Sequence, residues 1–137
     1  FRSYPQFAAK LTSSTTLRDG RPTLVIQRSE DLDQIFLRCI QDCVSEFLAS
    51  HDTEIDCYDR ILVAVPPTIN RASMAEALGA PADRICAPNA SDRDPFTSSV
   101  AALWECLANA EPMESGVRWL IVAAGAGIEI GCVEYQH

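Results

Sequence analysis

The chain has 137 residues, which is enough for one domain or for one half of a larger unit. Its net charge is −8, with acidic residues along the whole length, and this argues against nucleic acid and anionic membranes as partners. The most apolar stretch, residues 119–128, has about half the length needed to span a bilayer. With no signal peptide in sight, a cytoplasmic protein is expected.

The cysteines favour a structural interpretation over a metal site. There are six, at positions 39, 43, 57, 86, 106 and 132, and no two have the C-x-x-C spacing. The only histidines, His51 and His137, stand apart from them. No metal and no cofactor is therefore expected, and most of the cysteines are predicted to be small buried residues. His51 is expected to be solvated, near the end of a helix.

The first half of the chain contains one dominant signal. Residues 1–22 have weak periodicity and a turn signal at Asp19-Gly20, which predicts an irregular N-terminal segment. Residues 23–27 form a short strand candidate. A helix of about 20 residues follows, with Ser29 as the expected N-cap and two acids in its first turn. Its apolar residues recur at steps of three and four: Leu32, Ile35, Phe36, Cys39, Ile40, Cys43, Val44, Phe47 and Leu48.

The second half alternates strands with helices. Residues 61–65 are a continuous apolar run, typical of a strand that is covered on both faces. Residues 71–78 predict a short helix that Gly79 and Pro81 end, and residues 84–87 a short strand. Asp94-Pro95 signals the start of another helix, and strands at 117–124 and 128–135 close the chain. The order β-α-β-α-β-α-β-β predicts an α/β fold with a five-stranded mixed sheet covered by α-helices.

This order and its loops resemble the C-terminal half of a thiolase-fold protein, and most closely ketoacyl-acyl-carrier-protein synthase III and its relatives. The resemblance runs from about Thr23 to Tyr135. It covers the long helix and the strand that leads into Pro66 and Asn70. The other matching fragments are Leu78-Gly79, Thr97-Ser98-Ser99, and Ala124-Gly125-Ala126-Gly127-Ile128 followed by Gly131. Residues 23–137 are accordingly expected to form a thiolase-like C-terminal domain.

Two positions depart from the family pattern. Where the family has Pro-His-Gln-Ala-Asn, this chain reads Pro66-Pro67-Thr68-Ile69-Asn70, so that Pro67 occupies the position of the catalytic histidine. Where the family has Gly-Asn-Thr-Ser, it reads Pro95-Phe96-Thr97-Ser98, so that Phe96 occupies the position of the catalytic asparagine. The resemblance implies that the histidine and asparagine side chains of the family donate hydrogen bonds to the enolate formed by decarboxylation. Proline and phenylalanine donate none, and no catalytic residue is expected in this chain.

Further residues are candidates for a site. The turn Gly125-Ala126-Gly127 resembles the one whose backbone amide contributes to the family's oxyanion hole. Pro67, Asn70 and Phe96 are candidates to line a pocket. The alternative is a purely structural role, in which the two prolines end a strand and Asn70 caps the next helix.

These observations predict a degenerate synthase III-like domain that forms a pocket and a dimer without condensing malonyl units. The alternative is an acyltransferase or a diverged condensing enzyme with a nucleophile from the N-terminal half. An unrelated binding module is the third hypothesis. The expected partners are the N-terminal half of the same fold, in the same or a separate chain, and a second subunit in a homo- or heterodimer. An acyl carrier protein or acyl-CoA is the expected source of the acyl group.

Overall fold

The structure is a computed structural model, and it describes residues 1–66, 68–88, 99–110, 115–125 and 127–137. Among these residues the strands are β1 (Arg2–Ser3), β2 (Leu11–Arg18), β3 (Arg21–Arg28), β4 (Arg60–Ala64), β5 (Ile85–Cys86), β6 (Arg118–Gly125) and β7 (Glu129–Gln136). The α-helices are α1 (Leu32–Ser50), α2 (Arg71–Leu78) and α3 (Ser99–Ala110). Short 3-10 turns lie at η1 (Pro5–Lys10), η2 (Ile55–Cys57) and η3 (Ala82–Arg84). None of the described helices combines the length and the apolar character that crossing a membrane requires.

The main sheet has five strands in the order β1-β7-β6-β4-β5. Strands β5 and β6 run parallel to β4, whereas β7 runs antiparallel to β6, and β1 to β7. The predicted five-stranded mixed sheet is confirmed, but one of its strands was wrongly identified. The strand at residues 23–27 belongs to β3, which pairs with β2 in a separate two-stranded sheet, and the fifth strand is the two-residue β1.

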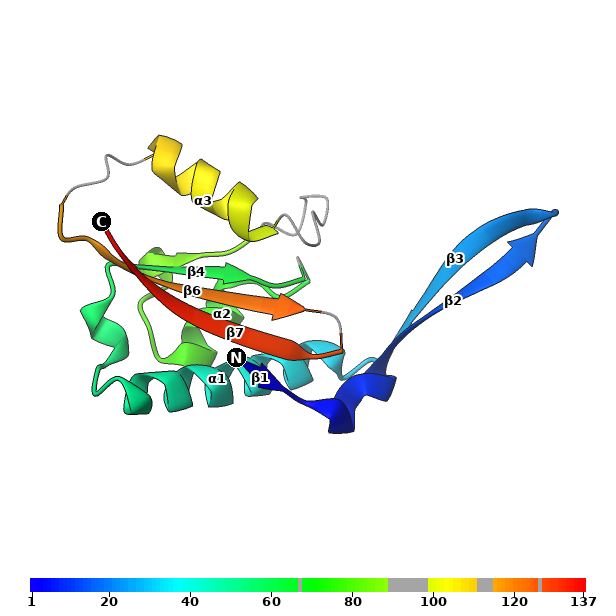
Figure 1. The fold of residues 1–137 in the computed structure, drawn as a ribbon, viewed down its shortest axis with the longest axis horizontal. Helices are drawn as coiled ribbons and strands as arrows, with labels where there is room; N and C mark the ends of the chain where they lie inside the picture. Colours follow the sequence, from blue (N-terminus) through cyan, green and yellow to red (C-terminus); the bar gives the residue numbers. More distant parts are fainter. Residues whose placement is uncertain (67, 89–98, 111–114, 126) are drawn as a thin grey trace.

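Helices cover both faces of this sheet. Side chains alternate between the two faces along each central strand, so each strand contributes residues to both layers. Ile61 and Val63 of β4 point into the larger core beneath α1 and α2, whereas Leu62 between them packs under α3. Figure 1 shows the sheet between α1 on one side and α3 on the other. The central strands are buried on two faces, which explains why their sequences are continuously apolar.

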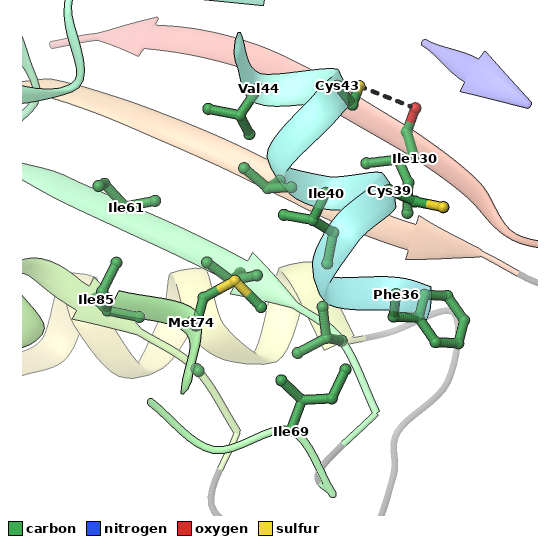
Figure 2. Packing of buried hydrophobic residues seen from close by; sticks show 14 of the residues in the cluster. Phe36, Cys39, Ile40, Cys43, Val44, Ile61, Ile69, Met74, Ile85 and Ile130 are labelled. Carbon is green, nitrogen blue, oxygen red and sulfur yellow. Dashed lines mark hydrogen bonds between the residues drawn. The ribbon is translucent and has the colours of Figure 1, made fainter. Parts of the chain in front are cut away.

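The apolar stripe of α1 contributes seven buried residues to the larger core. Cys39, Ile40 and Cys43 are buried, as the periodicity predicts, and they face the sheet in Figure 2. The N-cap prediction was wrong. The helix begins at Leu32 with Asp31 as its N-cap residue, and Ser29 instead lies in the preceding turn, where its carbonyl accepts a hydrogen bond from the amide of Leu32.

Two sulfur atoms meet between α1 and β7. Cys43 Sγ lies 3.6 Å from Cys132 Sγ and also contacts the carbonyl oxygen of Ile130, a contact drawn in Figure 2. Burial, reinforced by the neighbouring Cys43, raises the pKa of Cys132 to about 12. All six cysteines are free, and Cys57 and Cys106 are exposed. Cys39 and Cys43 are buried as predicted and Cys86 and Cys132 are half-buried, so the prediction that most of the six cysteines are buried is wrong.

Strands β2 and β3 form a ribbon that projects from the body of the molecule (Figure 1). The prediction of irregular structure for residues 1–22 is therefore wrong for β1, for β2 and for the first two residues of β3. Thr12–Thr16 of β2 is a run of Ser and Thr that is exposed on both faces, so it lacks the alternation of apolar and polar residues that marks a half-buried strand. This strand is defined by its pairing with β3. The pairing crosses residues 22 and 23, where the boundary between the N-terminal segment and the domain was expected.

A polar cluster of Tyr58, Arg118 and Glu134 lies at the end of β6 and β7 opposite their connecting turn. The hydroxyl of the fully buried Tyr58 donates to Glu134 Oε2 at 2.9 Å. Arg118 donates to both carboxylate oxygens of Glu134 and lies over the ring of Tyr58, 5.1 Å from its centroid. Hydrogen bonds from Arg118 and from Tyr58 hold the pKa of Glu134 below its ordinary value. The cluster ties the segment before β4 to the β6–β7 hairpin.

Candidate functional site

The site predicted from the sequence lies at one edge of the main sheet. Because β4, β5 and β6 are parallel, their carboxyl ends lie at the same edge, and Ala64 of β4 is in register with Ala123 of β6. The segment after β4, the segment after β5 and the β6–β7 turn therefore all leave the sheet there. In α/β sheets this edge is where ligands usually bind.

The segment after β4 is held from below by apolar contacts. Val65 and Ile69 are buried in the larger core, and the amide of Ile69 donates to the carbonyl of Pro66 at 3.0 Å. Between them, Thr68 is exposed. The backbone at this sheet edge is thus anchored on both sides of position 67.

Asn70 is the N-cap of α2. Its Oδ1 accepts a hydrogen bond from the amide of Ser73 at 2.9 Å, which satisfies one of the amides that the first turn of a helix leaves unpaired. The helix ends as predicted at Gly79, whose φ of 65° is the left-handed conformation that a glycine adopts without strain. The capping role expected for Asn70 is confirmed, and a role in lining a pocket stays a prediction.

A charged pair supports the same segment from the side. Asp33 Oδ1, in the first turn of α1, accepts hydrogen bonds from Thr68 Oγ1 at 2.9 Å and from Arg28 at 2.6 Å. Arg28 also reaches Thr68 Oγ1 at 3.4 Å. These three residues, which we call the Arg28–Asp33–Thr68 cluster, join the end of β3, the start of α1 and the segment after β4. Sequence analysis missed them, because no local motif connects residues that lie 40 positions apart.

The β6–β7 turn contributes backbone groups rather than side chains. Gly125 ends β6 and is exposed, and Gly127 has a φ of 77°. The next residue, Ile128, is fully buried although its φ is 58°, a conformation that costs a β-branched residue about 1–2 kcal/mol. Its carbonyl accepts a hydrogen bond from the amide of Tyr4 at 3.1 Å. Burial and this bond fix the turn at the sheet edge.

Several sequence-predicted residues fall outside the described part of the chain. Pro67, Phe96 and Ala126 are among them, as is the helix start expected at Asp94-Pro95. The described residues therefore fix the segments that flank these positions. Of the candidates, Asn70, Gly125 and Gly127 are placed, and all three belong to segments at the carboxyl edge of the sheet.

The described residues also bear on a metal site and on His51. Within the described ranges, no group of three or more His, Cys, Asp and Glu side chains is arranged to hold a metal ion. His51 occupies the C-cap of α1, is exposed and stacks on Phe47 with ring centroids 4.2 Å apart, as its position after the long helix predicts.

The fold defined by these elements is the thiolase-like α/β fold of ketoacyl-acyl-carrier-protein synthase III enzymes, as the solved structures show. The chain is similar to 3-oxoacyl-(acyl carrier protein) synthase III, FabH, from Pseudomonas aeruginosa, with a TM-score of 0.77 and 14% identity over 98% of this chain and 42% of that one. It is similar to the synthase III of Thermus thermophilus, with a TM-score of 0.72 and 16% identity over 99% and 44%. It is also similar to cerulenin-bound OleA from Xanthomonas campestris, with a TM-score of 0.73 and 11% identity over 99% and 38%.

These matches establish the fold and no more, because all the identities are low. The chain spans less than half the length of these solved structures. No protein-family profile matches it, and no curated protein matches it in sequence.

Proposed function

We propose that this chain is the C-terminal half of a ketoacyl synthase III-like unit that helps to shape an acyl pocket and a dimer but does not carry out decarboxylative condensation. It acts as an accessory subunit, or as part of a pseudoenzyme, in fatty-acid or polyketide-type acyl chemistry in the cytoplasm. Acyl groups arrive on an acyl carrier protein or on CoA.

The observation that carries this proposal is the pair of residues at the two positions where the resemblance implies hydrogen-bond donors. Pro67 lies in sequence between the buried residues Val65 and Ile69, and Phe96 precedes α3. Neither side chain carries an N–H or O–H group. An enolate develops negative charge on oxygen, and each preorganised donor removed there typically costs on the order of 10²–10³ in rate, about 3–4 kcal/mol.

The geometry of the sheet edge supports the proposal. The segments that carry positions 67 and 96 follow β4 and β5, which are adjacent parallel strands. Their starting points are therefore neighbours, as a site with two convergent donors requires. Replacing both donors removes the group of side chains on which the condensing step depends, while the buried residues that shape the edge remain.

A second function is favoured by the β6–β7 turn. Backbone amides do not depend on side-chain identity, so the turn that contains Gly125 and Gly127 retains the ability to polarise a thioester carbonyl. With a nucleophile and a base from the N-terminal half, the unit would transfer acyl groups, or condense them by a diverged route, through a covalent acyl-enzyme.

Acyl capture distinguishes these two functions. The whole protein is incubated with a labelled acyl thioester, and its intact mass is measured after acid quenching. The accessory role predicts no covalent adduct. An adduct that survives denaturation and maps to one cysteine or serine would establish the acyltransferase and overturn the accessory role.

A further inference from the structure

The β2–β3 ribbon has one apolar face and one mainly polar face. The pairing places Leu24 opposite Thr15 and Leu17 opposite Pro22, so that these side chains lie on the same side of the ribbon, together with Ile26. The other side presents mainly Thr, Ser and Gln. Such two-sidedness is typical of a sheet that is buried on one face.

In this chain the apolar face is uncovered. Leu17 is 75% exposed, Leu24 64% and Ile26 53%, and they account for three of the five large hydrophobic residues that are strongly exposed in the described part of the chain. The ribbon extends away from both helical layers in Figure 1. Its base is held by Lys10, whose carbonyl accepts from the amide of Ser29 and whose ammonium group pairs with Asp31 at 2.7 Å.

A two-stranded ribbon with this exposure is not expected to be stable without a covering surface. An isolated hairpin is only marginally stable in water, and clustered exposed hydrophobic side chains usually mark a docking surface. The ribbon is anchored at one end alone, so its order along 18 residues needs further contacts.

We propose that the apolar face of the ribbon, formed by Leu17, Pro22, Leu24 and Ile26, docks onto the part of the thiolase-like fold that this chain does not contain. This inference rests on the proposed function, because it takes the N-terminal half as the partner of this chain.

Two observations favour this occupant over a second copy of the chain. The matched synthase III and OleA structures align with 98–99% of this chain, a share that includes nearly all of the ribbon, so the ribbon belongs to the shared fold. More than half of each of those chains has no counterpart in this chain, and this further part of the shared fold is the surface to which we assign the ribbon.

Charge separates the two faces of the ribbon. Residues 11–28 contain Arg18, Arg21 and Arg28 against the single acid Asp19, a local balance of +2 in a chain with a net charge of −8. Arg18 and Arg21 lie at the exposed tip of the ribbon. Because paired residues share a face and successive pairs alternate, these two arginines lie on the face opposite Leu17 and Pro22, and the docking surface is expected to be apolar.

Hydrogen–deuterium exchange of the ribbon amides in the whole protein tests the proposal without any substitution. A docked ribbon exchanges slowly at protein concentrations where the protein is a monomer as well as where it is a dimer. Exchange at the rate of an unprotected peptide would overturn the proposal. Protection that disappears when two copies of this chain dissociate, while its N-terminal half stays bound, would also overturn it, since the covering surface would then be a second copy.

A pair of double variants locates the contact on one face. Leu24→Lys with Ile26→Lys is expected to accelerate exchange in the ribbon about tenfold or more, because two charges would be buried in the contact. The matched control, Thr16→Lys with Gln27→Lys, places the same charges on the exposed opposite face and is expected to leave exchange unchanged. Equal effects of the two variants would refute a docking face.

The exchange experiment and the acyl-capture experiment can give independent results. Acyl capture reports on the nucleophile, whereas ribbon exchange reports only on coverage of these four side chains. A protein that forms an acyl-enzyme and protects its ribbon would refute the accessory role and leave the docking surface intact.

Discussion

Replacing Tyr58 by phenylalanine tests the polar cluster that joins the start of β4 to the β6–β7 hairpin. The substitution removes one hydroxyl and keeps the buried ring. In the structure this hydroxyl donates to Glu134 at 2.9 Å, and Tyr58 is fully buried. A hydrogen bond to a charged group contributes about 1.5–3 kcal/mol to stability. Because the Glu134 side chain is 29% exposed, the lower end applies, and a loss of about 1.5 kcal/mol is expected.

Urea unfolding at pH 7 measures this loss. With a slope of ~1.5 kcal/mol/M, the midpoint is expected to fall by about 1 M. Tyr135→Phe is the matched control, because the Tyr135 hydroxyl makes only an exposed contact of 3.3 Å to His137, and its loss is expected to stay within about 0.5 kcal/mol. Equal midpoints for the two variants would refute the contribution assigned to the Tyr58–Glu134 bond.

The same bond predicts a pH dependence with a definite sign. The folded-state pKa of Glu134 is held low by Arg118 and Tyr58, so the unfolded chain binds the proton more readily. The stabilisation is therefore fully present above the ordinary value of 4.5 and is lost as the pH falls through the folded pKa. Tyr58→Phe is expected to reduce this acid-induced loss of stability. A variant with the same pH profile as the unmodified protein would contradict this cause.

Three further predictions concern other parts of the chain. Asn70→Ala is expected to cost about 1 kcal/mol in urea unfolding, because it removes the cap on the Ser73 amide, whereas Asn70→Asp keeps an acceptor and should cost less; equal losses would refute the cap. Ile40→Ala, at a fully buried position of α1, is expected to cost about 2–5 kcal/mol in the same assay, and Ile40→Val about 0.5–1.5 kcal/mol. A loss below about 1 kcal/mol for the alanine variant would contradict the packing. Alkylation at pH 8, followed by mass spectrometry, is expected to modify the exposed Cys57 well before Cys132. The Glu54 backbone and Thr53 lower the pKa of Cys57, whereas burial raises the pKa of Cys132 to about 12. The reverse order of reaction would refute these environments.

Sequence analysis predicted the elements whose signals are local. The stripe of α1 repeats at helical spacing, and α2 carries its own start and stop residues in Asn70 and Gly79, so both helices were placed within a few residues of their ends. The central strands were recognised because burial on two faces makes them continuously apolar. The N-cap of α1 was misplaced because Ser29 and Asp31 are both suitable caps by residue type.

Elements and contacts that depend on tertiary structure were missed. Strand β2 is exposed on both faces and is defined by its pairing with β3, so its composition resembles that of a loop. The Arg28–Asp33–Thr68 cluster and the Tyr58–Glu134 bond join residues up to 76 positions apart, and only the folded sheet brings them together. The positions of Asn70 at the start of α2 and of Gly125 and Gly127 at the β6–β7 turn follow from the assignment of helices and strands, whereas their role in a site stays a prediction.

The measurement that tests the central claim most directly is the release of carbon dioxide from a labelled malonyl thioester by the whole protein. The claim is that positions 67 and 96 donate no hydrogen bond to an enolate. Release at the level of a heat-denatured control is predicted, since two missing donors cost on the order of 10²–10³ each. Decarboxylation at the rate of an active synthase III assayed alongside would contradict the account.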